Sequence, residues 1–203
     1  QKGFIYLFYL LGLETAPLPR SMNVEITWNC NLNCFMCPRN RAQPFKVDNK
    51  NMPLSEFKQI VEKIPSCKHI NIVGDGEPFV NADFFGMLYF AESKGITVSF
   101  NSNGTLLSEK NILRLPKNVT LIWISIDSPV KETYERIRSG ADFDVLIHNL
   151  EMLSKLRKDI QIIFQPAVMK RNMIEMPKII DIAKRVNASV NFVDLMAFDE
   201  GLE

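Results

Sequence analysis

The residues best suited to chemistry in this 203-residue chain are three cysteines with the spacing Cys30-x3-Cys34-x2-Cys37. Closely spaced thiolates of this kind are ligands for iron–sulfur clusters. Three ligands are one short of the four that close a four-iron cluster, so one iron would stay open. An open iron can bind a substrate or cofactor, whereas a fourth cysteine would complete an electron carrier.

The composition fits a metal protein of a reducing compartment. Three of the four cysteines fall within eight residues, and the fourth is Cys67, so a disulfide framework is not indicated. The chain is 46% apolar, enough for one domain with a buried core. Its formal net charge is +1 and it has no basic tract, which argues against nucleic acid or an anionic membrane as a partner.

A zinc site is the main alternative for the cysteines. The pair Cys34-x2-Cys37 alone is more typical of half a zinc knuckle or of a redox pair. Such sites need a second pair, and only Cys67, His69 and His148 remain. A zinc or iron–sulfur protein with no chemistry of its own therefore stays open as a hypothesis. Cys67 itself is expected to be an inert buried thiol.

The N-terminus contains an apolar run over residues 4–13. This run is about half as long as a bilayer-spanning helix, and no small-x-small cleavage site follows it. We therefore expect residues 1–21 to form an apolar packing segment and residues 22–203 to form the domain. A membrane-associated or signal function of the segment is the alternative.

Apolar stretches alternate with helical periods along the rest of the chain, which predicts an α/β fold. Near-continuously apolar strands indicate parallel strands covered by helices, since parallel sheets are buried on both faces. A closed eight-stranded barrel typically needs ~250 residues, so six strands indicate a partial (β/α)6 TIM-like barrel with parallel strands. The charged stretch 131–138 is expected to be a solvated helix face. Strands are predicted at 22–28, 69–73, 97–101, 120–126, 160–168 and 190–195, and helices at 57–64, 83–93, 108–115, 143–156 and 176–186.

Polar residues follow the predicted strands. The second strand leads into Gly74-Asp-Gly-Glu-Pro78, the third into Asn101-Ser-Asn-Gly104 and the fourth into Ser125-Ile-Asp127. Gln165 is an amide within the fifth strand, and Met196 comes just after the sixth. Functional residues in such a fold lie at the carboxyl ends of the strands, so these residues are expected to line a pocket over the sheet.

Together these motifs resemble those of the radical S-adenosylmethionine (radical SAM) enzyme family. The cysteine loop, the Gly-Glu-Pro turn, the Asn-Gly turn and the Ser-x-Asp strand end occur in the family's order, between about Met22 and Met196. Four short sequence motifs also resemble those of the branch that contains molybdenum cofactor biosynthesis cyclases and peptide-modifying SPASM-domain enzymes. They cover residues 101–107, 125–128, 137–140 and 168–172.

The resemblance implies a radical SAM core in which Cys30, Cys34 and Cys37 hold a [4Fe-4S] cluster. S-adenosylmethionine would chelate the open iron through its amino and carboxylate groups. An electron from a donor such as flavodoxin or ferredoxin would then cleave the cofactor to a 5′-deoxyadenosyl radical. This radical would abstract hydrogen from a peptide or small-molecule substrate in the cytoplasm, so the chain would act as an oxidoreductase.

The resemblance also implies contacts with S-adenosylmethionine. Gly76 and Glu77 would receive the methionine amino group, and Met36 would lie against the adenine through its backbone. The family's usual Gly-Gly-Glu-Pro begins here with Asp75, which is a mild departure.

The remaining contacts are implied at later strand ends. Ser102, Ser125 and Gln165 match positions that contact polar groups of the cofactor. Asp127 would lie near the ribose or carboxylate, and Met196 matches a methionine that packs on the adenine.

These positions each have a second interpretation. Glu77 could be an exposed acid of its turn, and Ser125 and Asp127 could cap the following helix. Gln165 could satisfy neighbouring backbone groups, and Met196 could be a core residue.

Overall fold

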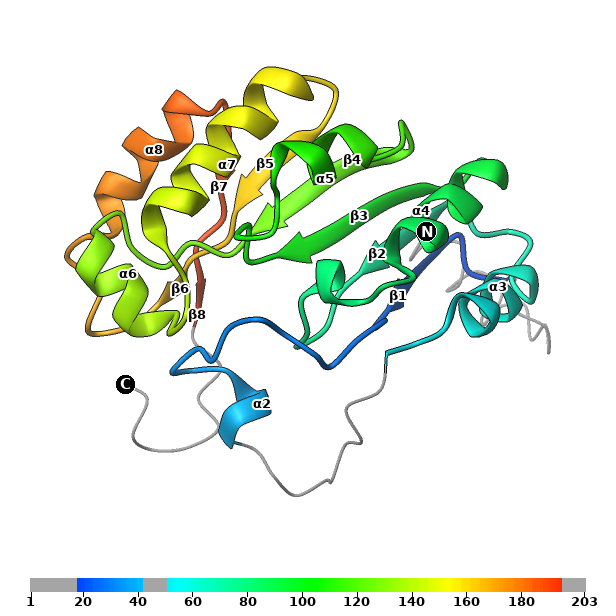
Figure 1. Cartoon of the computed structure of the whole chain (residues 1–203), viewed down its shortest axis with the longest axis horizontal. Coiled ribbons are helices and arrows are strands. Elements are labelled where there is room, and N and C mark those ends of the chain that lie inside the picture. Colours follow the sequence, from blue (N-terminus) through cyan, green and yellow to red (C-terminus); the bar gives the residue numbers. More distant parts are fainter. Residues whose placement is uncertain (1–17, 42–50, 195–203) are drawn as a thin grey trace, which may run out of the picture.

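The computed structural model describes residues 18–41 and 51–194, in which a six-stranded parallel sheet carries helices on one face (Figure 1). All five strand pairings are parallel. The order β1-β2-β3-β4-β5-β7 follows the chain, as expected for successive strand–helix–strand units. The strands are β1 (Ser21–Val24), β2 (His69–Ile72), β3 (Thr97–Ser102), β4 (Val119–Ile124), β5 (Gln161–Phe164) and β7 (Ser189–Val190).

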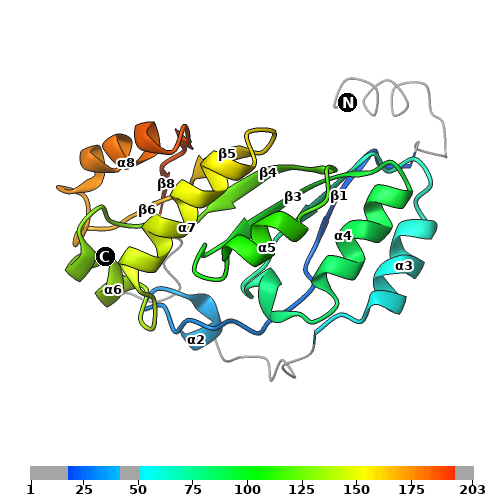
Figure 2. The same ribbon diagram turned by 45° about the horizontal axis from the view of Figure 1, so that its top comes forward.

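The helices alternate with the strands along the chain and lie close to the predicted residue ranges. Figure 2 shows α4, α5 and α7 on the same side of the sheet. The long helix α7 coincides with its predicted range, and Asp142 caps it by accepting hydrogen bonds from the backbone nitrogens of Asp144 and Val145. The helices are α2 (Pro38–Arg41), α3 (Leu54–Glu62), α4 (Phe84–Ser93), α5 (Glu109–Arg114), α6 (Lys131–Ile137), α7 (Phe143–Leu156) and α8 (Ile179–Arg185), with 3-10 turns η1 (Pro78–Val80) and η2 (Met176–Lys178).

The core lies between the helices and one face of the sheet. Alternate residues of β2, β3 and β4, such as Ile70, Phe100 and Ile122, are completely buried there. The expected burial of both faces is wrong for the described residues, because the other face carries polar side chains in β1 to β3. Ser99 donates a hydrogen bond to Asn71, and Asn71 donates one to Asn23. This polar row is the inner face of an unclosed barrel.

The last two predicted strands are each divided. The fifth breaks at Pro166, which lacks a backbone donor, into β5 and β6 (Ala167–Val168). The sixth divides into β7 and β8 (Val193–Asp194), and β6 pairs with β8 in a separate two-stranded sheet. The partial barrel is thus confirmed, and it is not closed within the described residues.

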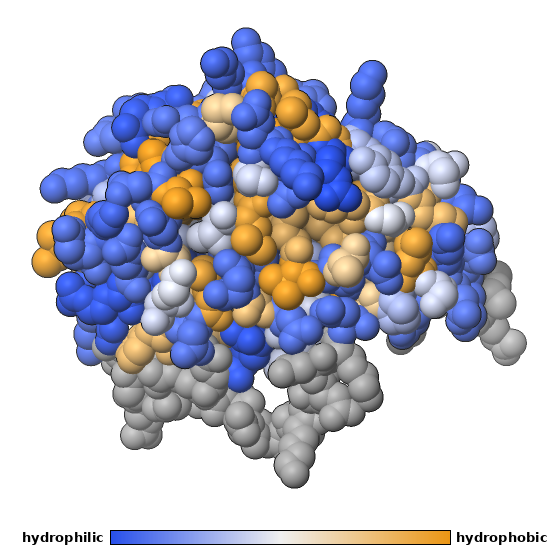
Figure 3. Space-filling model, viewed as in Figure 1, coloured by the Kyte–Doolittle hydropathy of each residue, from blue (hydrophilic) through white to orange (hydrophobic). Residues whose placement is uncertain are grey.

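The surface in the view of Figure 3 is mainly hydrophilic at its periphery, and apolar side chains gather near its centre. None of the described helices has the length and apolar content that a bilayer crossing requires. The apolar run at 4–13 lies outside the described residues, so the packing segment and the domain boundary at residue 22 stay predictions.

Candidate functional site

The three cysteines lie in the loop between β1 and α2, and none of them forms a disulfide bond. Cys34 is buried, and Cys30 and Cys37 are partly buried. Donors approach two of the sulfurs. The backbone nitrogen of Leu32 lies 3.4 Å and Nδ2 of Asn103 3.8 Å from Sγ of Cys30, and Nη1 of Arg138 lies 3.9 Å from Sγ of Cys34. Donors around sulfur stabilise thiolates and iron–sulfur clusters.

The loop is fixed by the segment 137–139, which we call the strap. The backbone nitrogens of Asn33 and Phe35 donate to the carbonyl oxygens of Ser139 and Ile137, both at 2.8 Å. On the other side, Nη2 of Arg39 donates to the carbonyl oxygen of Leu32 at 2.7 Å. These bonds connect the loop to the rest of the fold on two sides.

The donor set fits a cluster better than a single metal ion. Among residues 18–41 and 51–194, no group of three or more His, Cys, Asp or Glu side chains is placed to hold one ion, as structural zinc would require. A cluster instead takes each thiolate on a separate iron, so its cysteines need not converge on one point. Burial raises the pKa of the Cys30 and Cys34 thiols, and coordination to a metal would remove their protons.

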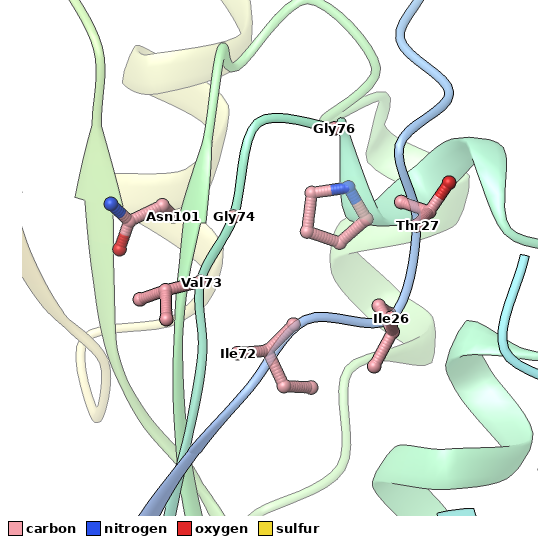
Figure 4. A pocket seen from close by; sticks show the side chains of 8 residues that line it. Ile26, Thr27, Ile72, Val73, Gly74, Gly76 and Asn101 are labelled. Atoms are coloured by element: carbon pink, nitrogen blue, oxygen red, sulfur yellow. The ribbon is translucent and has the colours of Figure 1, made fainter. Parts of the chain in front are cut away.

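The Gly-Glu-Pro turn packs directly against the start of the cysteine loop. A Cβ atom on Gly76 would lie 2.2 Å from the carbonyl oxygen of Thr27, so only glycine fits. The backbone nitrogen of Glu77 donates to the carbonyl oxygen of Asn29 at 2.8 Å. Figure 4 shows the turn curving over a cavity of about 10 Å³, which has room for roughly one water. A cofactor would therefore have to lie on the open side of the turn.

Glu77 is almost completely buried, so its interpretation as an exposed turn acid is wrong. Its carboxylate accepts hydrogen bonds from Oγ of Ser102 at 3.0 Å and from the backbone nitrogens of Asn103 and Phe79 at 2.7 and 3.4 Å. Burial raises its pKa to about 7, although these donors oppose the shift. Glu77 thus joins the turn after β2 to the end of β3.

Asp127 is also completely buried, at the end of β4. Oδ1 accepts a hydrogen bond of 2.8 Å from the backbone nitrogen of Ala167, and Oδ2 forms an ion pair with Nε of Arg138 at 2.7 Å. Neither Ser125 nor Asp127 caps the following helix, because α6 has no side-chain cap hydrogen bond. Arg138 is only 8% exposed, so the predicted solvated face is wrong at this position. Its side chain turns inward because its counter-ion Asp127 is buried in the loop after β4.

The other predicted residues lie near this edge or outside the described part. Ser125 and Gln165 are partly buried at the ends of β4 and β5, and Met36 is partly buried in the cysteine loop. Met196 lies outside the described residues. The structure thus brings Gly76, Glu77, Ser102 and Asp127 to the cysteine edge, while their contacts with a cofactor stay predictions.

Two residues of this edge were missed from the sequence. Asn103 contacts Cys30, and Arg138 contacts Cys34. Both lie within motifs described above, at residues 101–104 and 137–140. Membership of these motifs is the feature of the sequence that could have identified them as site residues.

Residues 24–183 match the Radical SAM superfamily, and the chain belongs to this family. The family prediction from the cysteine loop is confirmed. Members of the family bind a [4Fe-4S] cluster and S-adenosylmethionine, which agrees with the three cysteines of the loop.

Two relatives show what the chain is similar to. It is 32% identical over 174 residues to the AdoMet-dependent heme synthase of Methanosarcina barkeri, covering 84% of this chain and 48% of the relative. It is 25% identical over 189 residues to the mycofactocin maturase MftC of Mycolicibacterium smegmatis, covering 91% and 47%. The chain thus spans about half the length of these relatives.

Solved structures confirm the fold. SuiB of Streptococcus suis bound to S-adenosylmethionine superposes with a TM-score of 0.77 at 13% identity, covering 99% of this chain and 46% of SuiB. The enzyme anSMEcpe with bound AdoMet gives a TM-score of 0.72 at 21% identity, covering 88% and 53%. At these identities the likeness concerns the fold alone.

Proposed function

We propose that this chain is the catalytic core of a radical SAM enzyme, with Cys30, Cys34 and Cys37 as ligands of a [4Fe-4S] cluster. The observation that carries this proposal is the loop of three cysteines outside any disulfide, held by the strap and with donors at two sulfurs, in a chain of this family. When bound, the cluster supplies the electron that cleaves S-adenosylmethionine, and the resulting 5′-deoxyadenosyl radical abstracts hydrogen from the substrate.

The chain's own residues position the cofactor. Glu77 is only 1% exposed, and its carboxylate already accepts three hydrogen bonds from the protein. Its role is therefore to stabilise the turn. We therefore assign reception of the methionine amino group to backbone carbonyl oxygens of the turn around Gly76. Ser125 and Gln165, partly exposed at neighbouring strand ends, are suited to bind polar groups of the cofactor. Asp127 affects the site indirectly, by forming the ion pair that positions Arg138.

The proposed substrate is a peptide or protein. This choice is supported by the similarity to mycofactocin maturase MftC and by the fold shared with SuiB, which has been solved bound to the precursor peptide SuiA. A small molecule is the second candidate, because the chain is also similar to a heme synthase. We further propose hydrogen abstraction as an oxidoreductase, a flavodoxin- or ferredoxin-like electron donor, and a cytoplasmic location where the thiols stay reduced.

Anaerobic reconstitution of the whole protein tests the proposal. We expect a brown, iron-loaded protein that releases 5′-deoxyadenosine when it is reduced in the presence of S-adenosylmethionine. Cys34→Ala should lose both colour and cleavage. Cys67→Ala is the matched control, because Cys67 is a buried thiol outside the loop, next to β2. Absence of deoxyadenosine from a fully loaded, reduced protein would refute the proposal.

A further inference from the structure

A buried charge pair lies directly behind one cysteine of the loop. Arg138 forms an ion pair with Asp127 through Nε at 2.7 Å, and its Nη1 lies 3.9 Å from Sγ of Cys34. The side chains of Arg138 and Asp127 are 10% and 0% exposed, so water screens these charges little. The guanidinium thus stands between a fixed carboxylate and a thiol.

We propose that Arg138 is a positioning residue that raises the reduction potential of the cluster through Cys34, with Asp127 as its fixed counter-ion. This inference rests on the proposed function, because it requires the cluster. Reduction adds one negative charge to the cluster, and a nearby buried cation with a donor directed at Sγ stabilises that charge. The carboxylate of Asp127 has the opposite effect, but it pairs with Nε of the guanidinium, whereas Nη1 is the nitrogen that contacts Sγ.

Arg138 carries a positive charge in the folded protein. A guanidinium stays protonated in proteins, and the Asp127 carboxylate, 2.7 Å from Nε, gives it a buried counter-ion. Nη1 is close enough to Sγ of Cys34 for this charge to interact with an anionic cluster held there.

The strap gives Arg138 this position. Its carbonyl oxygens at Ile137 and Ser139 accept the two backbone hydrogen bonds of the cysteine loop, and Arg138 lies between them. Asp127 is itself held by the backbone nitrogen of Ala167. One short segment therefore sets both the shape of the loop and the charge behind Cys34.

The two members of the pair should shift the potential in opposite directions. Asp127→Asn keeps an oxygen for the Ala167 nitrogen but leaves the cation uncompensated, so the potential should rise. Arg138→Met leaves an uncompensated carboxylate, so the potential should fall. We expect at least a tenfold change in the reduction equilibrium for Arg138→Met, or ~59 mV for a one-electron couple. The double variant should lie between Arg138→Met and the wild type.

The measurement is a potentiometric titration of the loaded whole protein, followed by electron paramagnetic resonance without S-adenosylmethionine. Arg157→Met and Asp159→Asn are the matched controls, because this ion pair lies near Leu115 and Pro116, away from the loop. Both controls should keep the wild-type potential. If Arg138→Met does not fold because of its unpaired carboxylate, Asp127→Asn and the neutral double variant still decide the question.

Potentials that follow the order Asp127→Asn, wild type, double variant, Arg138→Met would support the proposal. Equal potentials, or shifts of the same sign in both single variants, would overturn it. Failure of the wild type to load a cluster or to cleave S-adenosylmethionine would instead refute the proposed function. The two failures are therefore distinguishable.

Discussion

The carboxylate of Glu77 accepts a hydrogen bond of 2.7 Å from the backbone nitrogen of Asn103, which ties the turn after β2 to the end of β3. Asn103 in turn reaches Cys30 and donates to Oδ1 of Asn31. The acid is thus one hydrogen-bonded step from a cysteine of the loop. Because it is buried at this junction, its protonation affects the stability of the fold.

The metal-free protein should lose stability as the pH rises from about 4.5 to about 7. The pKa of Glu77 is raised from 4.5 to about 7, so the folded state binds a proton that the unfolded state has already released. Its contribution is fully present below about pH 4.5 and is lost as the pH rises to about 7. At about 1.36 kcal/mol per pH unit, the loss is roughly 3 kcal/mol.

Urea unfolding of the wild type and of Glu77→Gln between pH 4.5 and 8 measures this effect. The stability of the wild type relative to Glu77→Gln should fall across the window, because the amide does not titrate there. Parallel pH profiles for the two proteins would show that Glu77 is not the responsible group.

The substitution Gly76→Ala should destabilise the protein and its cysteine loop. The added Cβ would lie 2.2 Å from the Thr27 carbonyl oxygen and 2.8 Å from that of Asn29, and backbone atoms cannot move aside cheaply. We expect a loss of about 1–3 kcal/mol in unfolding free energy and a lower iron content after reconstitution.

Gly86→Ala is the control for this substitution. Gly86 lies within α4, and its added Cβ would meet the flexible Leu54 side chain at 3.1 Å. Alanine also favours a helix over glycine by about 1 kcal/mol, so little stability should be lost. Equal effects of the two substitutions would contradict the close backbone packing at Gly76.

The substitution Arg171→Ala should speed the loss of the cluster. The guanidinium carbon of Arg171 lies 3.9 Å from the ring centroid of Phe35, which is in the cysteine loop. Removing this contact loosens one side of the loop, so iron should transfer faster to a chelator. The control Arg114→Ala removes a similar contact, 3.8 Å from the Phe85 ring, on the helices. Matching rates of iron release in both variants would contradict the prediction.

Much of the site could be predicted because its residues are of unusual type and follow apolar strands. The cysteine loop and the turns at Gly76 and Ser102 were recognised from local sequence, and the parallel order of strands brings them to one edge. The break of the fifth strand had a visible signal in Pro166, whose missing donor interrupts pairing.

The role of Arg138 could not be predicted in the same way. Arginine in a charged helical stretch normally faces water, and only the folded chain brings Asp127 within 2.7 Å of it. The polar row of Asn23, Asn71 and Ser99 was missed for a related reason. Its side chains satisfy each other across strands, which no single strand reveals.

The strap also bears on how the protein acquires and loses iron. Many small metal sites form only when the metal arrives, and ordering each residue then costs about 1–2 kcal/mol. Here the backbone bonds from Asn33 to Ser139 and from Phe35 to Ile137 order the loop as the barrel folds. The entropic cost of ordering falls on folding and not on metal capture. We therefore expect a lost cluster to be rebuilt in the folded protein.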